Sequence, residues 1–118
     1  MTIMDSYRIA NKIAEIYDKY SGFVIIHGTD TMAYTASILS FIMLNLKKPV
    51  VLTGSQLPLS APYSDGYFNL IGAIMSTSLK IPEVTIFFCN KLMRGNRCQK
   101  YSAWDIDAFS SPTLEPII

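Results

Sequence analysis

Three side chains in this sequence have the chemistry to activate a hydroxyl group: those of Thr29, Asp30 and Lys100. A threonine hydroxyl is a weak nucleophile at neutral pH, so a nearby base must accept its proton. A lysine amine can be that base when it is partly desolvated and a carboxylate holds it in place. The three residues are therefore candidates for nucleophilic or acid–base chemistry. The alternative for Asp30, which follows a threonine at a predicted helix start, is a purely structural helix cap.

Other reactive side chains favour a structural interpretation. His27 is the only histidine and ends a predicted buried strand, so we expect it to be packed and hydrogen-bonded and to form no Ser-His-Asp triad. Cys89 and Cys98 do not have the pattern of a disulfide framework or a metal site, and we expect two free thiols in a reducing compartment. The sequence contains no glycine-rich phosphate-binding motif. We therefore expect neither a metal nor a cofactor.

A cluster of four cations lies near the end of the chain, at Lys91, Arg94, Arg97 and Lys100, with Tyr101 and Trp104 after it. Such a cluster is compatible with a nucleic-acid patch, and also with a solvated loop that holds one catalytic lysine. The formal net charge of the chain is only +1 at pH 7, so no overall field attracts nucleic acid or acidic lipid. We therefore favour the loop with one catalytic lysine.

The chain is short and poor in charge. Its 118 residues have the size of one domain. Only 16% of them are charged, whereas soluble domains usually have about 25%. We expect other chains, or further parts of a larger protein, to cover such a surface, and we predict self-association. No charge-free run exceeds 16 residues, and the one with helical spacing, residues 31–46, is shorter than the roughly 20 apolar residues that cross a bilayer, so it predicts a buried helix and no membrane partner.

Helical spacing of apolar residues occurs in three segments. In the first, Thr2 and Asp5 have the spacing of a capping box, and the helix is expected to end at Ser21-Gly22. The second segment runs from Thr31 to Leu46, before a Lys-Lys-Pro stop, and the third covers residues 67–80. The residues expected on the inward face of the third helix are Leu70, Ile71, Ile74, Met75 and Ser78.

Three short apolar runs, at residues 23–27, 49–54 and 84–88, alternate with these helices. They lack polar alternation, which is typical of parallel strands covered on both faces. The sequence therefore predicts a parallel α/β sheet with right-handed crossovers. After residue 90 we expect a hairpin around Gly95-Asn96 and a short extended piece over 108–111.

The candidate residues follow the ends of these strands. Ligands of open α/β sheets bind beyond the carboxyl ends of the strands. The first strand leads into Thr29 and Asp30, the second into Thr53, Gly54, Ser55 and Gln56, and the third into the basic segment with Lys100. We therefore expect Thr29, Asp30 and Lys100 to meet at one edge of the sheet.

The motif HGTDTM at residues 27–32, followed by KPVVLTGSQ at 48–56, resembles the bacterial-type L-asparaginase and glutaminase family, in particular its cytoplasmic type I branch. SDGYFNLIGAI and FFCNKLMRGNRCQK extend the resemblance over nearly the whole chain. It implies a flavodoxin-like three-layer α/β sandwich, with residues 1–118 forming part of the N-terminal domain. The first strands of that domain and the C-terminal domain are expected to be absent.

The resemblance also implies site residues. It assigns catalysis to Thr29, Asp30 and Lys100, and contacts with the amide of the substrate L-asparagine to Gly28, Thr29, Asp30 and Ser55. It implies a cytoplasmic homo-oligomer that uses no metal or cofactor. The family's TGGT-like threonine motif is not found in these 118 residues. We therefore expect this chain by itself not to hydrolyse asparagine at an enzymatic rate.

Other functions are compatible with the same resemblance. Relatives include proteins with lysophospholipase activity and archaeal tRNA-dependent amidotransferases, so the substrate could be another ester or amide. A non-catalytic interaction module of the same fold is a third possibility. Retention of Thr29, Asp30 and Lys100 together argues against that module.

Overall fold

The computed structural model describes residues 1–112 and 114–118. Its helices are α1 (Ile3–Ile16), α2 (Met32–Ile42) and α3 (Gly66–Thr77), with the short 3₁₀ turns η1 (Tyr17–Lys19) and η2 (Gly95–Arg97). Its strands are β1 (Phe23–Ile26), β2 (Val50–Thr53), β3 (Val84–Phe88), β4 (Lys91–Arg94), β5 (Gln99–Lys100) and β6 (Phe109–Ser110). No helix in the described part of the chain is long and apolar enough to cross a membrane.

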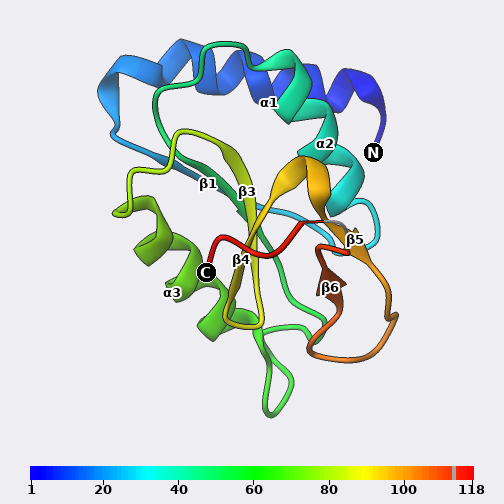
Figure 1. Cartoon of the computed structure of the whole chain (residues 1–118). Helices are drawn as coiled ribbons and strands as arrows, with labels where there is room; N and C mark the ends of the chain where they lie inside the picture. The colour runs from blue at the N-terminus through cyan, green and yellow to red at the C-terminus, as the bar shows by residue number, and fades with distance from the viewer. Residues whose placement is uncertain (113) are drawn as a thin grey trace.

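A four-stranded sheet in the order β1-β2-β3-β4 forms the middle layer. β1, β2 and β3 are parallel, and the register places Ile25 beside Leu52 and Leu52 beside Ile86. This confirms the predicted α/β class with a mainly parallel sheet. Helices α1 and α2 lie on one side of the sheet and α3 on the other, as Figure 1 shows.

The alternation of side chains along β2 explains the three layers. All four residues of β2 are buried. Val50 and Leu52 belong to the core under α1 and α2, whereas Val51 belongs to a separate cluster with Ala73 of α3. Successive strand residues point to opposite faces, so an apolar run without alternation must be covered on both.

The edge strand β1 departs from this pattern. We expected it to be covered on both faces, but Ile26 is 71% exposed. The reason is that β1 has only β2 beside it in the sheet, so less of the molecule is available to cover its carboxyl end.

The last strand of this sheet was not predicted. β4 is antiparallel to β3, and Phe88 pairs with Lys91 across the turn. The two turn residues, Cys89 and Asn90, both have positive φ, as a two-residue hairpin requires. The hairpin expected around Gly95-Asn96 is wrong because those residues form η2. The extended piece near 108–111 is confirmed as β6, which pairs with β5.

Helix α2 is shorter than the apolar run predicted. It ends at Ile42, and the chain then turns through Asn45 with a φ of 56°. The lysines at 47 and 48 therefore do not cap its C-terminus. Lys48 Nζ instead donates a hydrogen bond of 2.6 Å to the carbonyl oxygen of Tyr17 and lies 4.6 Å from the centre of the Tyr17 ring.

The first helix begins as its sequence indicates. The Thr2 hydroxyl accepts a hydrogen bond from the Asp5 backbone N–H, and the Asp5 carboxylate accepts one from the Thr2 backbone N–H. This confirms the capping box. The α-helix ends at Ile16 and η1 continues the turn to Lys19, just before the predicted stop.

Helix α3 packs on the sheet through small and polar residues, contrary to our prediction. Its buried residues are Gly66, Asn69, Ala73 and Ser76. The bulky residues Ile71, Ile74 and Met75, which we expected to face inward, are more than half exposed. The small residues let the helix lie close to β2 and β3, and buried Asn69 makes hydrogen bonds that an exposed position would not provide.

The close packing of α3 predicts an unusual response to a glycine substitution. In most helices, replacing glycine by alanine is stabilising by up to about 1 kcal/mol. A methyl group at Gly72, however, would overlap the ring of Phe87. We expect Gly72→Ala to lower the free energy of unfolding by about 1–3 kcal/mol in urea denaturation, as overpacking does. Exposed Ile74→Ala on the same helix is the control and should stay within about 0.5 kcal/mol.

The two cysteines are both free, as predicted, but differ in environment. Burial raises the pKa of the Cys98 thiol to about 12, partly offset by the charge of Lys91. Since the thiolate is the reactive form, we expect a disulfide reagent at pH 8 to label half-buried Cys89 and to leave Cys98 unmodified in the folded protein. Peptide mass spectrometry would identify the labelled thiol. Labelling in Cys89→Ser at the rate of the unchanged protein would contradict this assignment.

Candidate active site

The three candidate residues come together beyond the carboxyl end of β1. Lys100 Nζ lies 2.9 Å from Thr29 Oγ1 and 2.8 Å from Asp30 Oδ1, within donor distance of both. Thr29 and Asp30 lie in the loop between β1 and α2, and Lys100 comes from β5, about 70 residues further along the chain. Their juxtaposition is the one expected from strand ends.

The short β5–β6 pair holds Lys100 in position. Lys100 pairs with Phe109, and the next residue, Tyr101, donates a backbone hydrogen bond of 2.8 Å to the Ala108 carbonyl oxygen. Phe109 is fully buried, with its ring centre 4.8 Å from that of Phe88. The hydrophobic core therefore anchors β6, and β6 in turn holds its partner strand β5, which carries the Lys100 amine.

The amine is more shielded from water than its carboxylate partner. The Lys100 side chain is 14% exposed and that of Asp30 is 94% exposed. The hydrogen bond and charge of Lys100 lower the pKa of Asp30 from its ordinary value of 3.8. The helix-cap interpretation of Asp30 is wrong, because Thr31 occupies the N-cap position of α2 and no side-chain hydrogen bond caps that helix.

Gln56 is a fourth member of this group, and sequence reasoning gave it no role. The Thr29 hydroxyl donates a hydrogen bond of 3.0 Å to Gln56 Oε1. Gln56 Nε2 donates to the carbonyl oxygens of Ser102, at 3.4 Å, and Asp105, at 3.0 Å. Its position just beyond the carboxyl end of β2 was the signal that could have identified it.

A buried carboxylate braces the loop that carries Gln56. Asp65 is 6% exposed, and it accepts hydrogen bonds from the backbone N–H groups of Gln56 and Leu57. It also accepts one from Asn69 Nδ2. Asn69 in turn contacts the Gly54 carbonyl oxygen and the Cys89 N–H. The loop after β2 is thus tied to α3 and to the β3–β4 turn.

Gly28 and Ser55, the other residues expected to contact substrate, lie around a neighbouring cavity of about 330 Å³. Thr29, Asp30 and Lys100 do not line it. No heavy atom approaches within 4 Å of the position that a Gly28 Cβ would occupy, so the backbone there is accessible. The structure thus brings Gly28 and Ser55 together, beside the Thr29–Lys100 contact.

His27 is hydrogen-bonded, as predicted. Its Nε2 lies 2.9 Å from Thr35 Oγ1, and its Nδ1 lies 2.6 Å from the Gly28 carbonyl oxygen. The Gly28 carbonyl only accepts, so His27 Nδ1 carries a proton, and Nε2 is hydrogen-bonded to the Thr35 hydroxyl. The ring thereby connects the loop before Thr29 to α2.

The other cations of the basic segment lie on different elements. Lys91 forms an ion pair of 2.5 Å with Asp107, and Arg94 forms one of 3.2 Å with Glu83. Arg97 lies in η2 and is exposed. Among residues 1–112 and 114–118, no three His, Cys, Asp or Glu side chains gather as metal ligands would.

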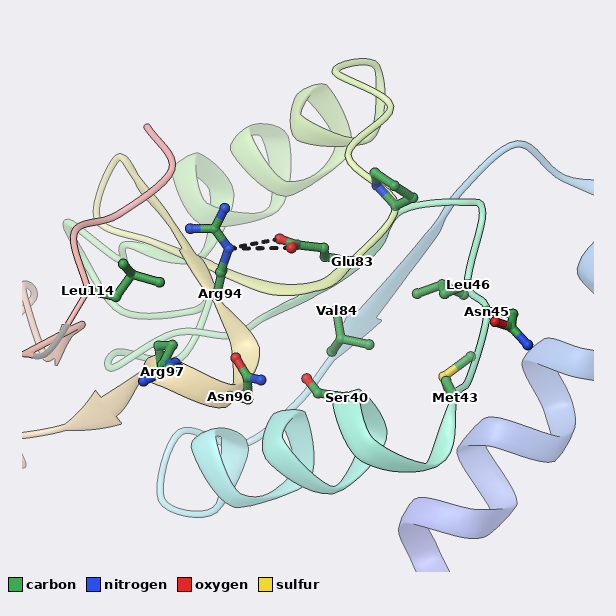
Figure 2. A pocket seen from close by; sticks show the side chains of 11 residues that line it. Ser40, Met43, Asn45, Leu46, Glu83, Val84, Arg94, Asn96, Arg97 and Leu114 are labelled. Carbon is green, nitrogen blue, oxygen red and sulfur yellow. Dashed lines mark hydrogen bonds and ion pairs between the residues drawn. The ribbon is translucent and has the colours of Figure 1, made fainter.

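A larger cavity lies far from this chemistry. Its volume is about 540 Å³, and it lies between the end of α2, the start of β3 and the end of β4, where the Arg94–Glu83 pair is found (Figure 2). Thr29 follows the carboxyl end of β1, whereas this cavity borders the amino end of parallel β3. Cavity size alone would therefore point to the end of the sheet opposite Thr29, Asp30 and Lys100.

Comparison with known proteins identifies similar sequences and folds. The family model described as "Asparaginase, N-terminal" matches residues 1–118. The chain is 55% identical over 119 residues to L-asparaginase 1 of Escherichia coli (strain K12) and 54% identical over 118 residues to the 60 kDa lysophospholipase of Mus musculus. The alignments cover 100% and 99% of this chain, but only 35% and 21% of those relatives.

A solved structure gives the same result for the fold. L-asparaginase I from Vibrio cholerae superposes with a TM-score of 0.93 at 56% sequence identity. The alignment covers 99% of this chain and 36% of that one. The chain therefore spans about a third of that structure and has the same fold over that third.

The Lys100–Asp30 contact predicts a measurable change in acidity. Replacing Lys100 by methionine removes the hydrogen bond and the charge that lower the pKa of the Asp30 carboxyl, so that pKa should rise. In the unchanged protein the Lys100–Asp30 ion pair is fully formed above the ordinary pKa of an aspartate. It is lost when the pH falls through the lowered pKa of Asp30, because the carboxylate then becomes protonated. A carbon-13 NMR titration of the Asp30 carboxyl would measure both values. The same pKa in Lys100→Met and in the unchanged protein would contradict the contact.

Proposed function

This chain belongs to the asparaginase family, and we propose that it supplies the Thr29–Asp30–Lys100 group for hydrolysis of the side-chain amide of L-asparagine to aspartate and ammonia. The observation that carries the proposal is that one amine, Lys100 Nζ, contacts both the Thr29 hydroxyl and the Asp30 carboxylate. A hydroxyl beside an amine that a carboxylate orients has the logic of a catalytic triad.

The proposed reaction proceeds through an ester on Thr29. Thr29 Oγ1 attacks the amide carbon and its proton passes to neutral Lys100 Nζ, which then gives the proton to the leaving nitrogen as the C–N bond breaks. Ammonia leaves, and water hydrolyses the ester to release aspartic acid and restore the hydroxyl. During formation of the ester, Lys100 thus acts first as a base toward Thr29 and then as an acid toward the leaving nitrogen.

The resting geometry indicates what must happen before attack. Lys100 Nζ donates to the oxygens of both Thr29 and Asp30. An amine accepts a proton only in its neutral form, so an ammonium group here must lose one proton before it can act as a base. The Asp30 contact keeps the amine beside Thr29.

We assign substrate contacts to Gly28, Thr29, Asp30 and Ser55. The accessible backbone at Gly28 and the cavity shared by Gly28 and Ser55 support a place for the amide beside Thr29. Backbone groups that approach a ligand closely favour glycine.

The surface and the cysteines support two further assignments. The exposed apolar face of α3, with Ile71, Ile74 and Met75, supports a homo-oligomer, since exposed apolar patches commonly mark contacts with other chains. Two free thiols support a reducing compartment such as the cytoplasm. Sedimentation of a monodisperse monomer at micromolar concentration would contradict the oligomer.

The catalytic assignment predicts activity in a chimera. This chain would replace the matching segment of Escherichia coli L-asparaginase 1, and ammonia release from L-asparagine would be measured. We expect Thr29→Ala and Lys100→Met each to lower kcat by about 10⁴-fold, as losses from catalytic triads do. The exposed Lys12→Met on α1 is the control and should retain activity.

Further arms of this assay address the alternatives. The chain alone is expected to show no saturable turnover, because Asp30 is open to water and the described residues around Thr29 do not form a dry, preorganised oxyanion site. Fatty-acid release from lysophosphatidylcholine, exceeding ammonia release from asparagine, would favour the lysophospholipase-like alternative. Full activity of the Thr29→Ala chimera would refute the role of Thr29.

A further inference from the structure

The Thr29 hydroxyl has two partners that require opposite roles from it. It lies 2.9 Å from Lys100 Nζ and 3.0 Å from Gln56 Oε1. An ammonium group can only donate and an amide oxygen can only accept. The hydroxyl has one hydrogen, so that hydrogen must lie on the Gln56 side while a lone pair faces Lys100.

The orientation of the Gln56 amide follows from its other contacts. Its second terminal atom lies 3.0 Å from the Asp105 carbonyl oxygen and 3.4 Å from that of Ser102. Two carbonyl oxygens require a donor, so this atom is the nitrogen. Turning the amide over would place its oxygen against both carbonyls, which makes the acceptor role toward Thr29 the stable one.

The backbone of Gln56 is held as firmly as its side chain. Its N–H donates to both carboxylate oxygens of Asp65, at 3.1 and 3.0 Å. Asp65 is itself buried and hydrogen-bonded to Asn69 of α3. The amide that contacts Thr29 therefore projects from a loop whose backbone is hydrogen-bonded, through Asp65, to α3.

We propose that Gln56 is a positioning residue that directs the hydroxyl proton of Thr29 away from Lys100 in the resting protein and joins the 102–105 turn to the nucleophile. This inference deepens the proposed function and rests on it for its catalytic meaning. Transfer of the proton to Lys100 then requires the amine to lose a proton to solvent and the hydroxyl to rotate from Gln56 toward the amine.

The contact with the 102–105 turn serves the same end. Ser102 lies two residues after Lys100, and its hydroxyl also accepts a hydrogen bond of 3.0 Å from the Asp105 N–H. Gln56 Nε2 therefore joins the two ends of a turn that directly follows the strand carrying Lys100. One amide thereby restrains both the hydroxyl and the backbone that presents its partner.

The experiment measures the hydroxyl proton directly and uses no substrate. In a 1:1 mixture of H₂O and D₂O, a slowly exchanging hydroxyl splits the threonine Cβ carbon signal in NMR into two lines. We expect two lines for Thr29 in the unchanged protein. Gln56→Met removes the acceptor while keeping the length of the side chain, so the lines should merge. Gln56→Leu provides a second variant without the acceptor.

Gln56→Glu separates the two contacts of the amide. It keeps an acceptor for Thr29 but loses the donor to Ser102 and Asp105. We expect the two Thr29 lines to remain, while hydrogen exchange of the Asp105 amide becomes about 10-fold faster, as a tenfold change in an opening equilibrium gives. Gln99→Met, at an exposed position of β5, should change neither signal.

The outcomes distinguish this proposal from the proposed function. A single Thr29 line in the unchanged protein, or two lines in a folded variant without the acceptor, would overturn the role of Gln56 whatever the chimera assay shows. Loss of the two lines in Gln56→Glu would also overturn it, because rescue by another acceptor would have failed. Conversely, the NMR result can hold even if the chimera releases no ammonia.

Discussion

The contact between Lys100 and the Thr29–Asp30 pair is the interaction that the surrounding strands and loops hold in place. It joins residues about 70 positions apart in the chain, so it forms only when the chain between them has folded. An ion pair with one exposed partner contributes little to stability, so it cannot by itself hold the β5–β6 pair in place. The buried Phe109–Phe88 packing does that, and the charged contact follows from it.

A second constraint is the buried polar network around Asp65. A carboxylate that is 6% exposed is costly unless it is hydrogen-bonded, and here two backbone N–H groups and the Asn69 amide provide the hydrogen bonds. Because Asn69 must reach both Gly54 and Cys89, the polar side of α3 faces the sheet. The requirement that positions Gln56 is therefore also the reason why the bulky residues of α3 point outward.

These two constraints explain which sequence predictions succeeded. Apolar runs on β2 and β3 identify buried strands because each strand must fill the cores on both sides of the sheet. The rule for strand ends was enough to bring Thr29, Asp30 and Lys100 together. Periodicity failed for α3, where bulky apolar residues and buried residues occupy different faces. The residue types that usually mark a turn also failed to identify the one at Cys89-Asn90, since neither residue is a glycine.

The sequence by itself determined the α/β class, the capping box of the first helix and the edge of the sheet where the candidate chemistry lies, because these depend on local spacing and chain order. Only the tertiary structure decided the antiparallel β4, the packing face of α3 and the role of Gln56. The physical reason is that the packing face of α3 and the role of Gln56 depend on partners distant in the chain, while β4 follows a turn at Cys89-Asn90 whose positive φ values are not marked by a glycine. The Gln56 amide is oriented by a hydroxyl 27 residues before it and a carbonyl 49 residues after it, and no local pattern encodes that pairing.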